Sequence, residues 1–503
     1  MDIEVKYLDN SHVQIQAEPN IVYELRDYFS FQPAGYQYQK KYKFGQWNGY
    51  IYLMDYNGKL PYGLWHLIKR FADSREYSVW VDPKIAETND ITRESFDQWV
   101  EKLDIYSGEK QIKPHWYQSD TVHHAIVNRR GVLNLPTSAG KSLIQCLLSR
   151  WFLEQYESKV LIIVPTTTLV DQMINDFVDY RLFPRNAIHG IRGGTAKDSD
   201  ALIYVSTWQS AVKQPPEWFQ QFGCLMVDEC HLATGLSITS IINSLTNCVY
   251  KFGLSGSLKD GKANTMQYVG AFGHIYKPVD THQLMKEGQV TNLKINTIFL
   301  RYNDADVKKA KGMDYPTEIG LITTHARRNA WIAKLALKLA REKQENIFIM
   351  FRLKKHGKWL YDALSKVYDN VVFIDGDTET DVRNEMKKIA ENTKGLIIVG
   401  SSGVLSTGVS IKNLHHIFFA HPSKSGVTVR QAIGRVLRLH ESKSIATLWD
   451  IVDNLATESR TKAAKNKYSS LNYCMKHALE RISIYNAEKF DYVIKNIDLE
   501  PKK

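Results

Sequence analysis

Lys141 and Ser142 close a short segment, residues 135–142 (Leu-Pro-Thr-Ser-Ala-Gly-Lys-Ser), that stands between an apolar stretch and an apolar helical segment. A strand, a tight loop and a helix in this order form a cradle for the phosphates of a nucleoside triphosphate. Backbone N–H groups surround the phosphates, the lysine reaches the β- and γ-phosphate oxygens, and the serine hydroxyl binds Mg²⁺. The residues expected to bind the nucleotide here are Thr137, Ser138, Ala139, Gly140, Lys141 and Ser142.

This loop departs from the general pattern G-x-x-x-x-G-K-[ST] at one position, because Leu135 stands where the first glycine is expected. For the loop alone, a Gly-Lys-Ser turn without a bound nucleotide explains the sequence equally well. Other parts of the chain are needed to choose between these interpretations.

Two carboxylates follow an apolar strand, residues 224–227, further along the chain. Residues just beyond the carboxyl ends of parallel strands face the ligand crevice, so Asp228 and Glu229 are expected beside the phosphate loop. Asp228 is the candidate Mg²⁺ ligand, and Glu229 is the candidate base that orients and deprotonates the attacking water. An isolated Asp-Glu pair would indicate an exposed acidic turn, but its position after a buried strand favours catalysis.

Arg435 and Arg438 are the third candidate group. They lie three positions apart, so that on a helix both would share one face. A guanidinium that reaches the transferring phosphoryl group stabilises its charge and accelerates the reaction by roughly 10³ to 10⁵. We expect Arg438 to reach the γ-phosphate and Arg435 either to share that role or to anchor the motif. Without the preceding motifs, two arginines on a solvated helix would be the simpler interpretation.

The hydrophobic pattern indicates the framework that must hold these groups. Apolar strands alternate with helices through residues 113–278 and again through residues 279–455. Buried strands in such an alternation form parallel sheets with helices on both faces. The sequence therefore predicts an α/β protein with two parallel-sheet domains in tandem.

The flanking segments have a different character. Residues 1–112 mix short β-rich runs with helical stretches and predict a small α+β accessory domain, which the aromatic and basic residues described below make a candidate DNA-binding domain. Residues 456–503 predict a short, basic helical tail. Within the second parallel-sheet domain, the polar segment 302–317 predicts a loop.

Composition narrows the class of partner. Lys and Arg number 65 against 54 Asp and Glu, which leaves a net charge of +11 and favours a polyanion such as nucleic acid. A basic protein without such a partner is the alternative. The five cysteines contain no C-x-x-C pair, so neither a zinc site nor a disulfide framework is indicated. No signal segment or run of 18 apolar residues is present, and we expect no membrane contact and a cytoplasmic setting, that of the host if the protein is of phage origin.

Over about 330 residues the chain resembles the superfamily 2 DExH helicases and translocases. The matching segments occur in the family's order: residues 116–118, 135–142, 164–172, 205–209, 228–231, 253–257, 400–409 and 431–438. Three positions depart from the family's usual pattern or fill a variable place in it. Ser138 replaces a glycine, Cys230 is the variable residue of the DExH motif, and Ser410 stands near where many relatives carry an aspartate.

The resemblance implies two RecA-like domains that use ATP and Mg²⁺. It implies that Gln118 reads adenine, that Gly408 and Gln431 also contact the nucleotide, and that His231, Ser255 and Ser257 couple hydrolysis to movement. It also implies that Thr166, Thr167 and Thr207 hold the backbone phosphates of a nucleic-acid strand, without reading its sequence.

Aromatic residues interleave with lysines in residues 35–50 of the N-terminal domain. Lys40, Lys41 and Lys43 can neutralise phosphates, and rings such as that of Trp47 can stack at a duplex junction. A plain β-hairpin with one aromatic core face explains the same pattern, and both interpretations stay open.

The chain as a whole resembles a family of branched-DNA helicases of T-even bacteriophages. That resemblance implies a helicase that unwinds and branch-migrates forks, Holliday junctions, D-loops and R-loops, including RNA–DNA hybrids, in recombination, replication and repair. We expect it to be a monomer, in the host cytoplasm if the protein is of phage origin. Spacing and charge by themselves support only an ATP-driven nucleic-acid motor. An RNA helicase, the motor subunit of a restriction system, and an inactive DNA-binding scaffold are the alternatives.

Overall fold

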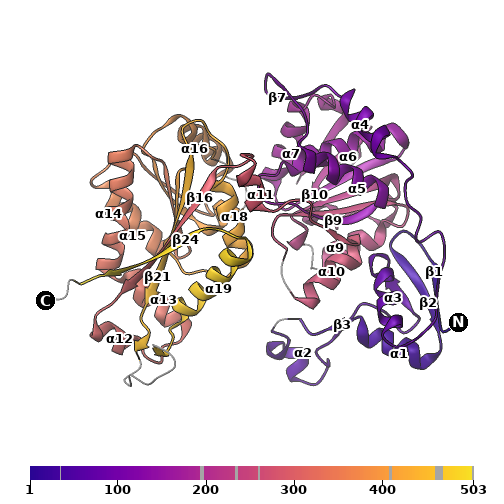
Figure 1. The fold of residues 1–503 in the computed structure, drawn as a ribbon, viewed down its shortest axis with the longest axis horizontal. Coiled ribbons are helices and arrows are strands. Elements are labelled where there is room, and N and C mark those ends of the chain that lie inside the picture. Colours follow the sequence, from indigo (N-terminus) through magenta and orange to yellow (C-terminus); the bar gives the residue numbers. More distant parts are fainter. Residues whose placement is uncertain are drawn as a thin grey trace. The chain divides into compact units, whose positions relative to one another are not determined.

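The computed structural model describes residues 1–33, 35–192, 198–232, 236–258, 261–406, 411–458 and 468–500 (Figure 1). The chain divides into two compact units. Unit 1 holds residues 1–135 and 140–279, and unit 2 holds residues 136–139 and 280–503. Within the described residues, each unit contains a seven-stranded sheet, and unit 1 has a further four-stranded sheet. The predicted α/β class, with two parallel sheets and a small N-terminal domain, is confirmed.

The N-terminal domain is built around a four-stranded sheet with the order β5-β2-β1-β6. Strands β1 and β2 are antiparallel, with Val5 opposite Ile15, whereas β6 runs parallel to β1. Alternate side chains of these strands enter one core together with residues of α1 and α3. The elements are β1 (Ile3–Tyr7), β2 (His12–Ala17), α1 (Pro19–Tyr28), β3 (Ser30–Phe31), β4 (Ile51–Tyr52), β5 (Lys59–Pro61), α3 (Trp65–Asp73) and β6 (Val79–Val81).

This domain is joined to the larger sheet of unit 1 by close packing and by a buried lysine. Val269 of helix α10 (Lys262–Phe272) belongs to the core of the N-terminal domain. A Cβ on Gly63 would lie 1.8 Å from the carbonyl oxygen of Val269, so only glycine allows this approach. The fully buried Lys251 donates from Nζ to the carbonyl oxygen of Asn10 (2.9 Å) and to Oγ of Ser11 (2.6 Å).

The larger sheet of unit 1 has the strand order β11-β12-β10-β13-β14-β9-β15, and all of its neighbouring strands are parallel. Its central strands are apolar and almost fully buried, as expected for a sheet covered on both faces. The strands are β9 (Arg130–Asn134), β10 (Lys159–Val164), β11 (Ile188–Ile191), β12 (Ile203–Thr207), β13 (Phe222–Asp228), β14 (Tyr250–Ser255) and β15 (Ile275–Tyr276). The other helices and strands of this region are α4 (Arg93–Glu101), β7 (Ile105–Ser107), β8 (Lys110–Ile112), α5 (Trp116–Asn128), α6 (Lys141–Gln155), α7 (Thr167–Asp179), α8 (Trp208–Ala211) and α9 (Leu236–Ser244).

Unit 2 repeats this architecture with the order β18-β19-β17-β20-β21-β16-β24. The chain moves outward from β16 to β18 and then returns across the sheet to β24. Because crossovers between parallel strands are right-handed, α14 and α15 lie on one face of the sheet and α18 and α19 on the other (Figure 1). The strands are β16 (Asn292–Arg301), β17 (Ile347–Phe351), β18 (Val371–Ile374), β19 (Ile397–Ser401), β20 (His416–Phe419), β21 (Ile445–Asn454) and β24 (Tyr492–Asp498). The helices are α11 (Thr281–Lys286), α12 (Asp304–Ala310), α13 (Tyr315–Thr324), α14 (Ala326–Lys343), α15 (Lys354–Ser365), α16 (Thr380–Asn392), α17 (Ser402–Ser406), α18 (Gly426–Val436) and α19 (Tyr473–Ala487).

The prediction of a loop at residues 302–317 is wrong, because this segment forms α12 and the start of α13. Its polar residues are helix caps. The side chain of Asn303 accepts from the backbone N–H of Asp306 (2.8 Å), and the side chain of Asp314 accepts from that of Thr317 (3.0 Å). A short polar stretch that supplies two successive N-caps resembles a loop in composition.

The predicted helical tail contains a helix, α19, but also a strand that the sequence did not predict. Strand β24 pairs in parallel with β16, with Ile295 opposite Tyr492 and Leu300 opposite Ile497. It lies at the edge of the sheet and is mostly exposed, so it lacks the long apolar run that revealed the central strands. The basic stretch at residues 460–467 lies outside the described residues.

Candidate nucleotide site and nucleic-acid interface

The loop between β9 and α6 has the backbone shape of an anion-binding turn. Ser138 and Gly140 both have left-handed φ angles, 72° and 74°, and Gly140 immediately precedes α6. Alternating left-handed and right-handed residues direct successive N–H groups to one side, where a phosphate binds. Ser138 replaces the family's glycine at a position that costs an L residue about 1 kcal/mol. Lys141 and Ser142 then begin α6, at the positive end of the helix dipole.

Gln118 lies against this loop. Its side chain is buried, and its Oε1 accepts from the backbone N–H of His115 (2.8 Å) in the capping box that begins α5. A Cβ added to Gly140 would lie 2.2 Å from Nε2 of Gln118. The structure therefore brings Gln118 to the phosphate loop, while its contact with adenine stays a prediction.

Three strands bring the predicted catalytic groups to one edge of the sheet. Asn134 at the end of β9 pairs with Ser255 at the end of β14, and Leu254 of β14 pairs with Asp228 at the end of β13. The carboxylate motif and the start of the phosphate loop therefore lie at the same carboxyl edge, where α/β proteins bind their ligands.

Asp228 is a buried carboxylate whose surroundings oppose its charge. Burial and the neighbouring charge of Glu229 raise the pKa of Asp228, and the positive charge of Lys141 opposes this shift. Its Oδ1 atom has no hydrogen-bond partner among the described residues. A buried carboxylate oxygen without a partner is costly unless a cation or water completes its surroundings.

Ser142 and Asp228 together fit a Mg²⁺ site. Mg²⁺ in nucleotide sites is usually held by one or two protein oxygens, with phosphates and waters as its other ligands. The Ser142 hydroxyl lies 2.8 Å from the hydroxyl of Tyr180, the residue after α7. No sequence motif points to Tyr180, because it lies 38 residues from Ser142 and outside every motif.

Glu229, His231, Ser255 and Ser257 form one connected polar network. Nδ1 of the buried His231 lies 3.1 Å from Oε2 of Glu229 and 2.9 Å from Oγ of Ser255. The Ser255 hydroxyl lies 3.4 Å from Glu229 and accepts from the backbone N–H of Ser257 (3.2 Å). The structure thus brings the predicted base into contact with the residues predicted to couple hydrolysis to movement. The coupling role itself is untested.

The three threonines predicted to hold a nucleic-acid strand lie at the N-termini of helices that follow two neighbouring strands, β10 and β12. Thr166 caps α7 by accepting from the N–H of Leu169 (3.4 Å), and Thr167 is exposed in the first turn. Thr207 pairs with Val164 across β12 and β10, and its buried hydroxyl caps α8. The N–H groups at the start of α7 are suited to binding a phosphate. The Thr207 hydroxyl, by contrast, already accepts from the backbone N–H of Ser210.

Residues 35–50 form an exposed segment, which we call the aromatic-lysine segment. It contains a 3₁₀ turn (Tyr36–Tyr38) and the short helix α2 (Lys40–Lys43), so the alternative of a plain β-hairpin is wrong. Lys40, Lys41 and Lys43 are exposed, and Trp47 is half-buried, donating from Nε1 to the carbonyl oxygen of Tyr50 (2.8 Å). Its aromatic side chains do not enter the core of the N-terminal domain.

In unit 2, Gln431 and Arg435 lie on α18, but Arg438 does not. The helix ends at Val436, with Leu437 as its C-cap. The expectation that one helix presents both arginines on the same face is therefore wrong. The helix stops here because Nζ of Lys443 binds the carbonyl oxygen of Val436 (2.7 Å), as well as those of Lys412 (3.0 Å) and Leu414 (2.9 Å).

Arg435 and Arg438 are both half-buried, and the backbone carbonyl of Arg438 accepts from the hydroxyl of Thr291 (3.2 Å). Gly408 lies outside the described residues, so its predicted contact with the nucleotide stays a prediction.

In the described part of the chain, no helix is long and apolar enough to cross a membrane.

Three known families match successive parts of the chain. Residues 2–82 match the N-terminal domain of DNA helicase UvsW, residues 87–260 match the res subunit of type III restriction enzymes, and residues 328–440 match the conserved C-terminal domain of helicases.

Individual relatives match over greater lengths. The ATP-dependent DNA helicase UvsW of Enterobacteria phage T4 is 56% identical over 503 residues, covering 99% of this chain and 100% of its own. A crystal structure of T4 UvsW is 53% identical with a TM-score of 0.55, covering 99% of this chain and 100% of its own. A second structure, of the UvsW helicase from bacteriophage T4, is 58% identical with a TM-score of 0.54, covering 55% of this chain and 100% of its own.

Proposed function

The chain belongs to the family of the ATP-dependent DNA helicase UvsW of phage T4, and we propose that it uses ATP to unwind and branch-migrate branched DNA. The proposed substrates are forks, Holliday junctions, D-loops and R-loops. The observation that carries the proposal is the 56% identity over the whole chain, which includes the N-terminal domain as well as the motor.

In the proposed reaction the loop before α6 binds the triphosphate, with Lys141 on the β- and γ-phosphates. Mg²⁺ held by Ser142 and Asp228 would neutralise charge on the phosphates. Glu229 orients the attacking water and accepts its proton, as its position beside Asp228 at the end of β13 supports. Arg438 and Arg435 supply positive charge to the γ-phosphate as the bond breaks.

His231 is proposed to transmit the state of this site. Its Nδ1 lies within hydrogen-bonding distance of both Glu229 and Ser255. If one of these residues changes its contact with His231, the contact between His231 and the other residue changes as well. Because a neutral imidazole nitrogen either donates or accepts, but does not do both at once, the network has two alternative arrangements. This supports a coupling role for the Glu229–His231–Ser255 contact.

The DNA-binding surface is proposed to include the N-terminus of α7 and the aromatic-lysine segment. No aspartate or glutamate occurs between Asp27 and Asp55, so the lysines of this segment act on a phosphate backbone without a nearby opposing charge in the sequence. Exposed rings, such as those of Tyr38 and Phe44 (each 73% exposed), can stack on bases opened at a junction.

The test is to measure ATPase stimulation and strand separation on a panel of substrates. The panel contains a fork, a four-way junction, a D-loop, an R-loop, a blunt duplex and single-stranded RNA. We expect the branched substrates to stimulate hydrolysis most and to be unwound. Equal stimulation by single-stranded RNA would contradict the DNA assignment, and equal activity on the blunt duplex would contradict the preference for branches.

A further inference from the structure

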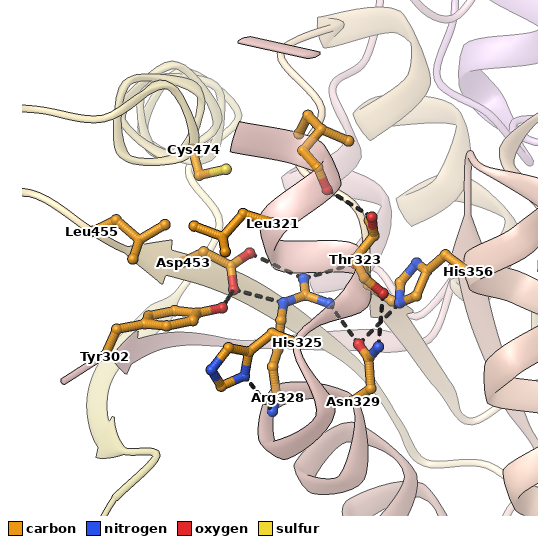
Figure 2. A network of polar contacts seen from close by, with 12 residues as sticks. Tyr302, Leu321, Thr323, His325, Arg328, Asn329, His356, Asp453, Leu455 and Cys474 are labelled. Carbon is orange, nitrogen blue, oxygen red and sulfur yellow. Dashed lines mark hydrogen bonds and ion pairs between the residues drawn. The ribbon is translucent and has the colours of Figure 1, made fainter. Parts of the chain in front are cut away.

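Helix α18, which carries Gln431 and Arg435, is reached through a loop held by two buried arginines. Arg328 of α14 forms a two-point ion pair with Asp453 (2.6 and 3.0 Å) and also donates to the carbonyl oxygen of Ala420 (2.8 Å). The hydroxyl of Tyr302 donates to the same carboxylate (2.7 Å; Figure 2). Ala420 follows β20 and begins the loop that leads to α18.

A second ion pair of the same construction lies on α19. Arg481 donates from Nε to both carboxylate oxygens of Asp450 (3.0 and 3.1 Å), and its Nη2 lies 2.7 Å from Oδ1 of the same carboxylate. Tyr485 also donates to that carboxylate (2.9 Å). The remaining arm of Arg481 donates to the carbonyl oxygen of Ser423 (2.8 Å), three residues before α18. Asp450, Arg481 and Tyr485 are completely buried.

Helix α19 is fixed at both of its ends. The buried carboxylate of Glu318 on α13 accepts from the backbone N–H groups of Tyr473 (2.9 Å) and Cys474 (2.8 Å), the first residues of α19. Just beyond the other end, Glu488 accepts from Nε of Arg430 on α18 (2.6 Å), and both side chains are less than 20% exposed.

Burying two complete ion pairs is not an efficient way to gain stability. Well-packed apolar side chains of similar size are often as stabilising or more so, because each buried charge must be desolvated. The arginines instead fix the orientation of the groups that they bind. When a planar guanidinium is paired with a carboxylate, its remaining N–H groups point in fixed directions. Here those groups hold Ala420 and Ser423, on the loop that sets the start of α18.

We infer that helix α19 is a positioning element for the arginine motif. Arg481 fixes the start of α18 through Ser423, and Glu488 fixes its rotation through Arg430. These two contacts set the position of Arg435 on α18 and, through the residues that follow the helix, contribute to the position of Arg438. The inference rests on the proposed function, because it assumes that these two arginines act on the γ-phosphate.

The main test is Glu488→Ala, measured as DNA-stimulated ATP hydrolysis. We expect kcat to fall about 10-fold, because a displacement of about 1 Å in a reacting group can cost as much as 100-fold. The KM for ATP should change less than about twofold, since the phosphate loop is untouched. Glu488→Gln keeps an acceptor oxygen and should lose less, which also provides a milder variant if Glu488→Ala is poorly folded.

Two further variants separate positioning from general stability. The exchange Arg430→Glu with Glu488→Arg should recover most of the lost kcat. Adding Glu488→Ala to Arg438→Ala should lower kcat little beyond Arg438→Ala alone, because both changes remove the same contribution. The control is Glu500→Ala, which breaks a more exposed ion pair with Arg327 (2.6 Å) and a hydrogen bond from Asn303 (2.8 Å) elsewhere in unit 2 and should leave kcat unchanged.

The possible outcomes are distinguishable. If Arg438→Ala slows turnover but Glu488→Ala only lowers the melting temperature, the inference is overturned and the proposed function stands. Additive losses in the double variant would also overturn the inference. If Arg438→Ala leaves turnover at the wild-type rate, the arginine assignment of the proposed function and the inference that rests on it both fail.

Discussion

The hydroxyl of Tyr180 lies 2.8 Å from the hydroxyl of Ser142, so the residue that follows α7 contacts the predicted Mg²⁺ ligand at the start of α6. Burial raises the pKa of Tyr180, which keeps its hydroxyl protonated and able to donate or accept. Because Thr166 caps the start of α7, one helix connects a predicted strand contact to the predicted nucleotide site.

Replacing Tyr180 with Phe removes only the hydroxyl. We expect the Mg²⁺ concentration for half-maximal ATPase activity to rise about 10-fold, since groups that orient metal ligands typically contribute 10- to 100-fold in affinity. The melting temperature should change little. Tyr156→Phe is the matched control, because it removes a hydroxyl paired with that of Tyr250 (3.1 Å). An unchanged Mg²⁺ dependence would show that Tyr180 does not orient Ser142.

Replacing Lys141 with Ala should abolish ATP hydrolysis while leaving DNA binding nearly intact. In the proposed reaction Lys141 supplies the charge that holds the β- and γ-phosphates, and the exposed lysines of the aromatic-lysine segment do not depend on it. Hydrolysis and fork binding should be measured on the same preparation. Retained hydrolysis would refute the phosphate-loop assignment.

Replacing Lys40, Lys41 and Lys43 together with Ala should weaken binding to branched DNA and reduce its salt dependence. Each phosphate contact contributes about 0.9 to the slope of log K against log salt concentration on duplex DNA, so the slope should fall by up to about 2.7. The control replaces three exposed lysines of α14, namely Lys334, Lys338 and Lys343. An equal loss in both triple variants would mean that only total charge matters.

Lys251 makes the stability of unit 1 depend on pH. Burial, and secondarily the charge of Arg130, lower the pKa of Lys251 from 10.5 to about 7. A lysine whose pKa falls on folding favours the folded state above its unfolded pKa, and this contribution is lost as pH falls toward the folded pKa. Thermal stability relative to Lys251→Met should therefore rise between pH 7 and pH 9.5. Lys443, whose pKa is also lowered to about 7, contributes equally to the pH dependence of both proteins, so its contribution cancels in the comparison. A constant difference across this range would contradict the assignment.

The candidate site residues that the sequence predicts belong to contiguous motifs. Lys141, Asp228 and Glu229 were recognisable because each follows an apolar strand whose carboxyl end must lie at the ligand edge of a parallel sheet. The same rule accounts for the contact between Glu229 and Ser255, which end or follow neighbouring strands.

What the sequence did not predict depends on packing between distant segments. Tyr180 reaches Ser142 only because α6 and α7 pack against each other. Arg438 lies off the helix because Lys443 binds the last carbonyl of α18 from a position seven residues away. Strand β24 is defined by its partner β16 rather than by its own hydrophobicity.

The pairing of β24 with β16 also has a consequence for biosynthesis. The two strands are separated by 190 residues of intervening chain, so β16 emerges from the ribosome long before its neighbour on that side exists. Until then its backbone N–H and C=O groups form an open edge that can pair with another nascent chain. Translation speed and chaperone access over this interval should therefore govern how much of the protein is recovered in active form.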